Sequence, residues 1–219
     1  SVLVIDDDEI ADPMWLENMC ATRERCKTDI VGGPQRPVFV KPEHQHFARH
    51  PVFSPHYAKT GVVPILYSSG NMLLGRHVLE AHGHPYLDLK FNFMGGGDAD
   101  FLDRSVRKGF KLAWCEEAPV FETVPERRTE SDWIRARSLR NGVISTLVEK
   151  KMRAKEPLGG LRTFAKSLAL LGASPFRAAL NSLKTGSISI GLYPVYIGVG
   201  RVLAEFGYSN EQYRNPEKN

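Results

Sequence analysis

The chain begins with a short apolar run that ends abruptly in acidic residues. Residues 1–5, Ser-Val-Leu-Val-Ile, are followed by Asp6, Asp7, Asp8 and Glu9. A β-branched run bounded by polar residues is typical of a buried strand that leads into a loop. In extended backbone alternate residues point the same way, so Asp6 and Asp8 can share a face while Asp7 points elsewhere. The run therefore predicts a strand with a carboxylate pair at its end.

Two carboxylates on one face suit a hard divalent cation. Mg²⁺ and Mn²⁺ take oxygen ligands, typically one or two protein carboxylates plus the phosphates of a substrate. A bound cation would also offset the repulsion among the acidic side chains. The alternative is an acidic surface turn that caps the next helix, and the acidic run alone does not choose between the two.

Composition is that of an ordinary globular protein, with 219 residues, 42% of them hydrophobic and 25% charged. The charge is uneven, since residues 1–148 hold 18 Lys and Arg against 20 Asp and Glu, and residues 149–219 hold 11 against 5. A basic tail fits a segment that binds anionic surfaces, and a merely soluble tail explains it equally well.

The three cysteines, Cys20, Cys26 and Cys115, are odd in number and lack metal-site spacing, which favours reduced thiols in a cytoplasm. No signal peptide is visible. Because the chain starts without Met inside an apolar run, we expect an upstream segment.

Strand and helix signals alternate along the first 150 residues. We expect a helix over 12–26, with Asp12 as its N-cap and Pro13 at its first position, and others over 98–108 and 129–152. The last begins with a loose capping box, Thr129 to Asp132. Strands are expected within residues 28–40, 65–74, 111–115 and 119–123, and a long loop over 41–61. Two further helices are expected over 160–173 and 189–208.

A second acidic group follows three glycines. Asp98, Asp100 and Asp103 come directly after Gly95, Gly96 and Gly97. Glycine lets a backbone approach a ligand closely, and the start of a helix favours negative charge. The same carboxylates could simply cap a helix.

A third group surrounds Trp133. Arginine suits bidentate contacts with phosphate oxygens. The alternative is that most of these arginines lie on a solvated helix face, because Arg135 and Arg137 cannot share a face. The group comprises Arg127, Arg128, Arg135, Arg137 and Arg140.

Together these segments carry a resemblance. The sequence VIDDDEIADPMWL, then GGPQRPVF, SSGNMLLGRHVL and the stretch from MGGGDADF to SLRNG resemble, in this order, the second half of an inverting family 2 glycosyltransferase of the GT-A fold. The similarity covers residues 1–145 and is greatest to bacterial members that build exopolysaccharides such as succinoglycan. It implies an α/β, Rossmann-like GT-A domain over residues 1–150 that lacks its N-terminal nucleotide-binding half, and a helical tail over 156–219.

The resemblance also implies roles for individual residues. Asp8 and Asp6 would hold the divalent metal, and Asp98 would be the base that deprotonates the acceptor hydroxyl. Glu122 lies where relatives place a His or an acid near the metal. Donor and diphosphate contacts would come from Asp6, Asp7, Arg128, Trp133 and Arg137. The acceptor and sugar pocket would be formed by Gly70, Asn71, Gly96, Gly97 and Asp100.

The implied reaction moves a sugar from a nucleotide-sugar donor, UDP-linked, to a hydroxyl of a glycan or lipid-linked acceptor with inversion. It would use Mg²⁺ or Mn²⁺ and no nucleic acid, in the cytoplasm at the inner face of the plasma membrane. One departure concerns Gly97, which stands where relatives carry an acid before the base.

Two other functions are compatible with the residues. A Mg²⁺-dependent phosphatase of the haloacid dehalogenase type also has a strand that ends in DxD and a later Gly-Asp motif, although Ile10 departs from its pattern. A catalytically inactive sugar-binding subunit is the other. For the tail, an interfacial membrane attachment competes with packing against the catalytic domain or a second subunit.

Overall fold

The structure, a computed structural model, describes residues 1–208 and divides into two compact units. The first unit comprises residues 1–48, 53–92 and 97–125, and the second comprises 49–52, 93–96 and the chain from 126 onward. The division therefore falls near residue 125 rather than near 150, because the helix that follows belongs with the tail helices. Residues 209–219 of the expected tail lie outside the described residues.

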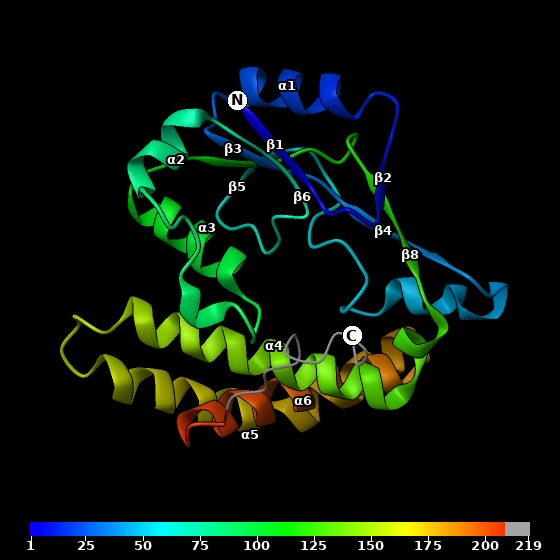
Figure 1. The fold of residues 1–219 in the computed structure, drawn as a ribbon. Coiled ribbons are helices and arrows are strands. Elements are labelled where there is room, and N and C mark those ends of the chain that lie inside the picture. Colours follow the sequence, from blue (N-terminus) through cyan, green and yellow to red (C-terminus); the bar gives the residue numbers. More distant parts are fainter. Residues whose placement is uncertain (209–219) are drawn as a thin grey trace. The chain divides into compact units, whose positions relative to one another are not determined.

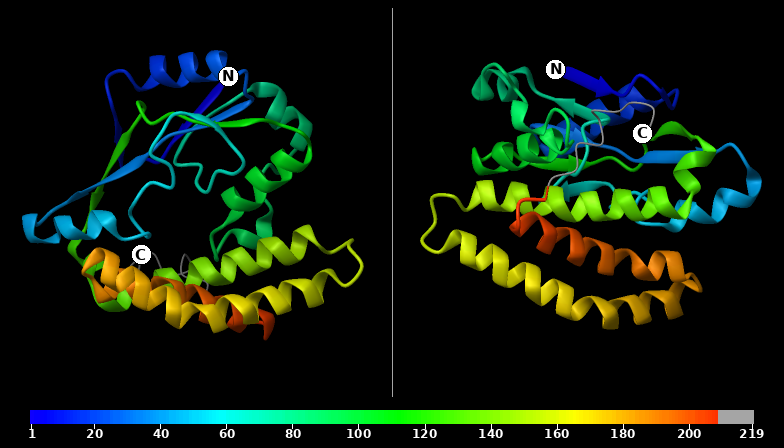
Figure 2. Two further views of the ribbon diagram at one scale, coloured as in Figure 1. Left: turned by 180° about the vertical axis from the view of Figure 1, so that it is seen from behind. Right: turned by 60° about the horizontal axis from the view of Figure 1, so that its bottom comes forward.

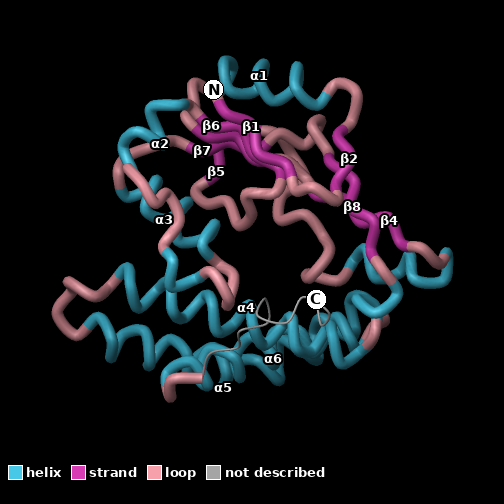
Figure 3. The backbone as a smooth tube through the Cα atoms, viewed as in Figure 1, coloured by secondary structure: helices cyan, strands magenta, loops and turns pink. Residues whose placement is uncertain are grey.

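A five-stranded sheet forms the centre of the first unit (Figure 3). The order of its strands is β1 (Val2–Ile5), β6 (Asn71–Leu74), β3 (Ile30–Gly32), β7 (Leu112–Trp114) and β5 (Gly61–Val63). β3 and β7 are parallel, and the other neighbouring pairs are antiparallel. The predicted strands are present, which confirms a mixed α/β fold.

A second, three-stranded sheet places acidic residues opposite each other. Its strands are β2 (Glu9–Ala11), β8 (Val120–Val124) and β4 (Gln35–Phe39), in that order. β2 is antiparallel to β8, with Glu9 opposite Glu122, and β4 is parallel to β8. The sequence did not predict β2, whose three residues include one charged side chain.

Helices cover both faces of the larger sheet (Figure 1). On one face α1 (Trp15–Cys26) buries Met19 against Val31 and Leu73. On the other, α2 (Arg76–His82) and α3 (Gly97–Arg107) pack over Ile30 and Leu74. α3 matches its prediction to within one residue at each end.

Three local predictions are wrong. α1 begins at Trp15, after an N-cap at Met14, because the Asp12 side chain accepts a hydrogen bond from the Met14 amide at 2.9 Å in a turn before the helix. Residues 41–61 are not a loop throughout, since they contain the 3₁₀ helix η1 (Pro42–Arg49). A shorter one, η2 (Leu89–Phe91), precedes α3. The capping box at Thr129 does not form, because the Thr129 hydroxyl donates to the Glu126 carbonyl.

Three long helices run side by side in the second unit (Figure 2). The 3₁₀ helix η3 (Glu126–Thr129) leads into α4 (Ser131–Met152), and α5 (Gly159–Thr185) and α6 (Ile188–Glu205) follow. α5 does not end at the predicted residue 173 but continues through Pro175 to Thr185. No helix in residues 1–208 is both long enough and apolar enough to cross a membrane.

A buried carboxylate joins these helices. Glu149 of α4 accepts hydrogen bonds from Arg201 of α6 at 2.7 Å and from Lys166 of α5 at 3.1 Å. Burial alone would raise the pKa of Glu149, but these two cations hold it below its usual range. Glu149 and Arg201 are 7% and 2% exposed, so removal of Glu149 would leave the buried Arg201 without its carboxylate partner.

His50 makes the stability of the second unit depend on pH. Its ring is fully buried, and burial lowers its pKa to about 4, although a hydrogen bond with the Ser189 backbone opposes the shift. Below pH 6.5 the unfolded chain binds a proton that the folded chain does not. The contribution of the neutral His50 ring to the free energy of unfolding is therefore fully present above pH 6.5. It decreases as the pH falls toward 4, by about 1.4 kcal/mol at pH 5.5.

We expect His50→Gln to remove this pH dependence, measured by urea unfolding between pH 7.5 and pH 4.5. His46 is exposed, so His46→Gln is the matched control and should keep the wild-type slope. A His50→Gln variant that still loses the same stability over this range would refute the assignment.

Candidate active site

Backbone hydrogen bonds fix the acidic turn that follows β1. The Asp6 amide donates to the Gly70 carbonyl at 3.3 Å, and the Glu9 amide donates to the Asp6 carbonyl at 3.2 Å. The turn therefore ends with Glu9 at the start of β2, opposite Glu122. We call the carboxylates that gather here the carboxylate group: Asp6, Asp7, Asp8, Glu9, Asp98 and Glu122.

Asp6 is perturbed by its position in the carboxylate group. Burial raises the pKa of Asp6, and the charges of Asp8, Glu122, Asp98 and Asp7 raise it further. Because these charges act on Asp6 together, Asp98 at the start of α3 lies near the acidic run.

Glu9 is a member of the carboxylate group with a strongly raised pKa. Burial raises the pKa of Glu9 to about 7, and the charges of Asp6 and Glu122 add to this. A hydrogen bond that Gln35 Nε2 donates to Glu9 Oε1 at 2.6 Å opposes the shift. The carboxylate group therefore holds more negative charge than its surroundings offset, and it would attract a cation.

The donor set fits a divalent cation that shares its ligands with a substrate. Residues 1–208 contain no group of three or more His, Cys, Asp or Glu side chains arranged to hold a metal ion. Mg²⁺ is often bound by one or two carboxylates with the remaining ligands from water and phosphate. Asp6 and Asp8 fit such a two-carboxylate site, and the repulsion on Asp6 is what a cation there would relieve.

Asp98 lies in the first turn of α3, where a helix favours a carboxylate. Its Oδ1 accepts a hydrogen bond from the Ala99 amide at 2.8 Å. Gly95 and Gly96 precede it with φ of 75° and 92°, angles that side chains other than glycine rarely adopt. These glycines thus turn the chain into α3, and Gly96 itself belongs to the second unit, where it lies against Ile144.

Gly70 lies against the acidic turn. A Cβ at this position would be 2.5 Å from both Asp6 Oδ2 and Gln35 Nε2. Only glycine leaves these two side chains where they are, so the close packing of Asp6 and Gln35 requires glycine at position 70.

Asn71 does not match its predicted place in a sugar pocket. It is 2% exposed, and its side-chain amide donates to the carbonyls of Pro34 at 3.0 Å and Ala118 at 2.9 Å. Its Oδ1 accepts from Trp15 Nε1 at 2.8 Å. These bonds make Asn71 a structural tie between three segments rather than a pocket-lining residue.

Asp100 also departs from the predicted sugar pocket. It is 2% exposed and pairs with Arg104 Nε at 2.8 Å. Arg104 donates further to the Tyr86 carbonyl, so Asp100 holds α3 to the preceding loop. Gly97, the other predicted pocket residue in α3, has room around it, since the nearest atom to a Cβ there is Phe91 Cβ at 3.6 Å.

The second unit brings the predicted arginine and tryptophan residues together. Arg128 and Arg137 place their guanidinium carbons 5.8 and 6.0 Å from the centre of the Trp133 ring. Both are cation–π distances. Arg135, by contrast, points away to an ion pair with Asp132 at 2.9 Å.

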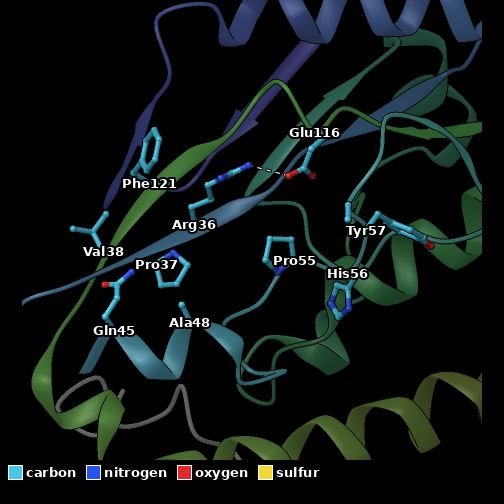
Figure 4. A pocket seen from close by; sticks show the side chains of 11 residues that line it. Arg36, Pro37, Val38, Gln45, Ala48, Pro55, His56, Tyr57, Glu116 and Phe121 are labelled. Carbon is cyan, nitrogen blue, oxygen red and sulfur yellow. Dashed lines mark hydrogen bonds and ion pairs between the residues drawn. The ribbon is translucent and has the colours of Figure 1, made fainter. Parts of the chain in front are cut away.

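The first unit also contains a cavity of about 560 Å³ with apolar and polar walls. Figure 4 shows Arg36 directed toward Glu116, with which it forms an ion pair at 2.8 Å, above Pro55, His56 and Tyr57. Neighbouring residues of a strand point to opposite faces, so Arg36 and Phe121 of the cavity wall lie on the other face from Gln35 and Glu122. Pro37, which also lines the cavity, lies opposite Glu122 in the register of β4 and β8, so the cavity adjoins the strand that carries Glu122.

Two residues of the site escaped the sequence analysis. Glu9 was visible in the acidic run, but its burial depends on the pairing of β2 with β8. Gln35 carries no signal in the sequence, because a lone glutamine after a Gly-Pro turn has no characteristic chemistry. Their pairing at 2.6 Å is a tertiary contact.

The fold and the site together define a mixed α/β protein with an acidic site beside the end of β1. The chain is similar to the succinoglycan biosynthesis protein ExoM of Rhizobium meliloti (strain 1021), at 31% identity over 141 residues, which are 63% of this chain and 44% of that protein. The match therefore spans less than half the length of this relative. No protein-family model matches the chain, and no solved structure matches it.

We expect Gly70→Ala to disturb the carboxylate group, because its new methyl group would displace Asp6 or Gln35. The pKa of Asp6 and the chemical shifts of its neighbours, followed by NMR titration, should change. Gly97→Ala is the matched control, since its methyl group meets only ordinary contacts and should leave stability unchanged or raise it by up to about 1 kcal/mol. Equal spectra for wild type and Gly70→Ala would contradict the packing described.

Proposed function

We propose that the chain is part of a glycosyltransferase of exopolysaccharide biosynthesis, with a GT-A catalytic domain. It would move a sugar from a nucleotide-sugar donor to a hydroxyl of a glycan or lipid-linked acceptor, with inversion. The observation that carries the proposal is the convergence of Asp8, Glu122 and Asp98 on Asp6. The similarity to a protein of succinoglycan biosynthesis supports the same class.

The base of this reaction would be Asp98. As the acceptor oxygen attacks the anomeric carbon, its proton passes to the Asp98 carboxylate while the bond from that carbon to the diphosphate oxygen breaks. The products are the glycoside, with inverted configuration, and a nucleoside diphosphate. Asp98 lies in the first turn of α3, where the helix dipole favours a negative charge.

Asp6 and Asp8 would hold the divalent cation, Mg²⁺ or Mn²⁺. When bound, the cation supplies positive charge for the diphosphate that departs. Glu9 and Gln35 would position Asp6, because Glu9 lies beside it and Gln35 holds Glu9 through the 2.6 Å hydrogen bond. Glu122, opposite Glu9 in the small sheet, would add a further carboxylate beside this pair.

The group of Arg128, Trp133 and Arg137 suggests an anion-binding role for the start of the second unit. Trp133 holds both guanidinium groups near its ring, which limits their freedom before a ligand arrives. Two arginines fixed in this way suit phosphate oxygens. We propose a phosphate group as their ligand.

Asp98→Asn should lower the turnover of sugar transfer by roughly 10²–10⁴-fold, because the amide cannot accept the proton. Donor affinity should stay within error, measured by isothermal titration calorimetry with Mn²⁺ present. Asp103→Asn, on the same helix and paired with Arg107, is the matched control and should keep wild-type turnover. Unchanged turnover in Asp98→Asn would remove Asp98 as the base.

Asp8→Asn should weaken Mn²⁺ binding by roughly tenfold or more, because a two-carboxylate site loses half of its charge. Electron paramagnetic resonance of free Mn²⁺ measures this without donor or acceptor. Asp103→Asn again serves as the control, and equal Mn²⁺ affinity in Asp8→Asn and wild type would exclude Asp8 as a ligand.

A Mg²⁺-dependent phosphatase would use the same carboxylates, so the reaction itself must decide. The protein is incubated with Mn²⁺ or Mg²⁺, a panel of sugar nucleotides and acceptor extract, and nucleoside diphosphate release is followed by chromatography. Release that requires the acceptor supports the transferase. Hydrolysis of phosphate esters, with no release from any sugar nucleotide, would replace the transferase with the phosphatase.

A further inference from the structure

α5 buries its small side chains. Thr163, Ser167, Ser174 and Ala178 are the buried residues along its length after Gly159. The hydroxyls of Thr163 and Ser167 donate to backbone carbonyls of their own helix, at 3.0 Å each. The neighbouring helix approaches closely here, since a Cβ on Gly198 of α6 would lie 3.0 Å from Leu171 Cα. The buried face of α5 is therefore small and internally satisfied.

Five large apolar side chains of α5 point the other way, whereas Phe164, Leu170 and Leu171 are half-buried. Leu183, Phe176 and Leu161 are 82%, 71% and 61% exposed. At about 100° per residue they fall, with two further leucines, within an arc of about 120° opposite the buried residues. We call this surface the outer face of α5: Leu161, Leu168, Phe176, Leu180 and Leu183. A water-exposed helix face that carries five large apolar side chains departs from the usual pattern, in which the exposed face is polar.

Basic side chains line one edge of the outer face. Arg162, Lys166, Arg177 and Lys184 all fall beside it on the helical projection, and α5 contains no Asp or Glu. Lys166 is bound to Glu149, and Arg162 lies 3.8 Å from Glu156. Within the described residues, no acidic side chain pairs with Arg177 or Lys184. The edge therefore offers uncompensated positive charge beside exposed apolar surface.

We infer that the outer face of α5 binds the surface of an anionic lipid bilayer, with its leucines and Phe176 among the acyl chains and Arg177 and Lys184 at the headgroups. Apolar residues on one face with Lys and Arg at the boundary is the arrangement of an interfacial helix. The charge argues for a lipid surface over a second copy of the chain, because two copies of α5 would bring like charges together. Arg177 and Lys184 both lie in the C-terminal half of α5, so this half meets the headgroups when the helix lies flat.

Vesicle flotation tests this inference with the full chain and needs neither donor nor acceptor. The protein should float with phosphatidylcholine vesicles that contain phosphatidylglycerol, far less with phosphatidylcholine alone, and less as salt increases. Arg177→Gln with Lys184→Gln should lower partitioning by roughly 30-fold at low salt. Phe176→Ser with Leu183→Ser should lower it by roughly 100-fold, because both side chains leave the bilayer.

Matched controls come from exposed residues of the first unit. Arg76→Gln with Lys90→Gln removes the same charge, and Leu89→Ser removes an apolar side chain that is 64% exposed. Both controls should partition like wild type. Circular dichroism should be the same for every variant, since all the altered side chains are on the surface.

Three results would overturn the inference. Wild-type protein that stays unbound with phosphatidylglycerol vesicles is one, and outer-face variants that float as well as wild type are another. The third is a wild-type dimer in analytical ultracentrifugation that Phe176→Ser with Leu183→Ser converts to a monomer, which would make the outer face a self-association surface. Because none of these measurements involves sugar transfer, they are independent of the proposed catalytic function.

Discussion

Repulsion among carboxylates is the constraint on which the first unit depends. The register of the small sheet sets Glu9 directly opposite Glu122, and a pair of like charges in this arrangement costs stability. The chain adds Asp6 and Asp98 to the same neighbourhood and supports them with Gln35 and a glycine that leaves them room. A fold selected for stability alone would separate these charges. Perturbed carboxylates of this kind are typical of sites where a cation or a proton takes part in function.

Local patterns predicted most of the elements, and tertiary contacts decided where those predictions were wrong. α3 follows from its glycines, its acidic first turn and the closing Gly109, all of which are local. The start of α1 does not follow from local patterns, because the Asp12 carboxylate accepts a hydrogen bond in a turn that precedes the helix. The grouping of α4 with the tail helices was not predicted, since it depends on tertiary contacts, among them those of the buried carboxylate Glu149.

The same distinction applies to the site. The order of motifs predicted that Asp6 and Asp98 come together, and that Arg128 and Arg137 gather at Trp133. The place of Asn71 could not be predicted, because its three hydrogen-bond partners lie 37, 47 and 56 residues away in the sequence. For α5, a periodic pattern shows that two faces differ in character. It does not show which face turns inward, and here the smaller side chains do.

Glycines make the helices of the second unit act mechanically as one body. Gly142 of α4 lies against the backbone of Ile197, and Gly200 of α6 lies against the backbone of Leu139, so the two helices touch main chain to main chain at two points. No side chain is present at these points to change rotamer and absorb a displacement. Gly198 makes a similar contact between α6 and α5. α4, which carries Trp133 and Arg137 at its first turns, is thus packed main chain to main chain against α6, and α6 packs in the same way against α5.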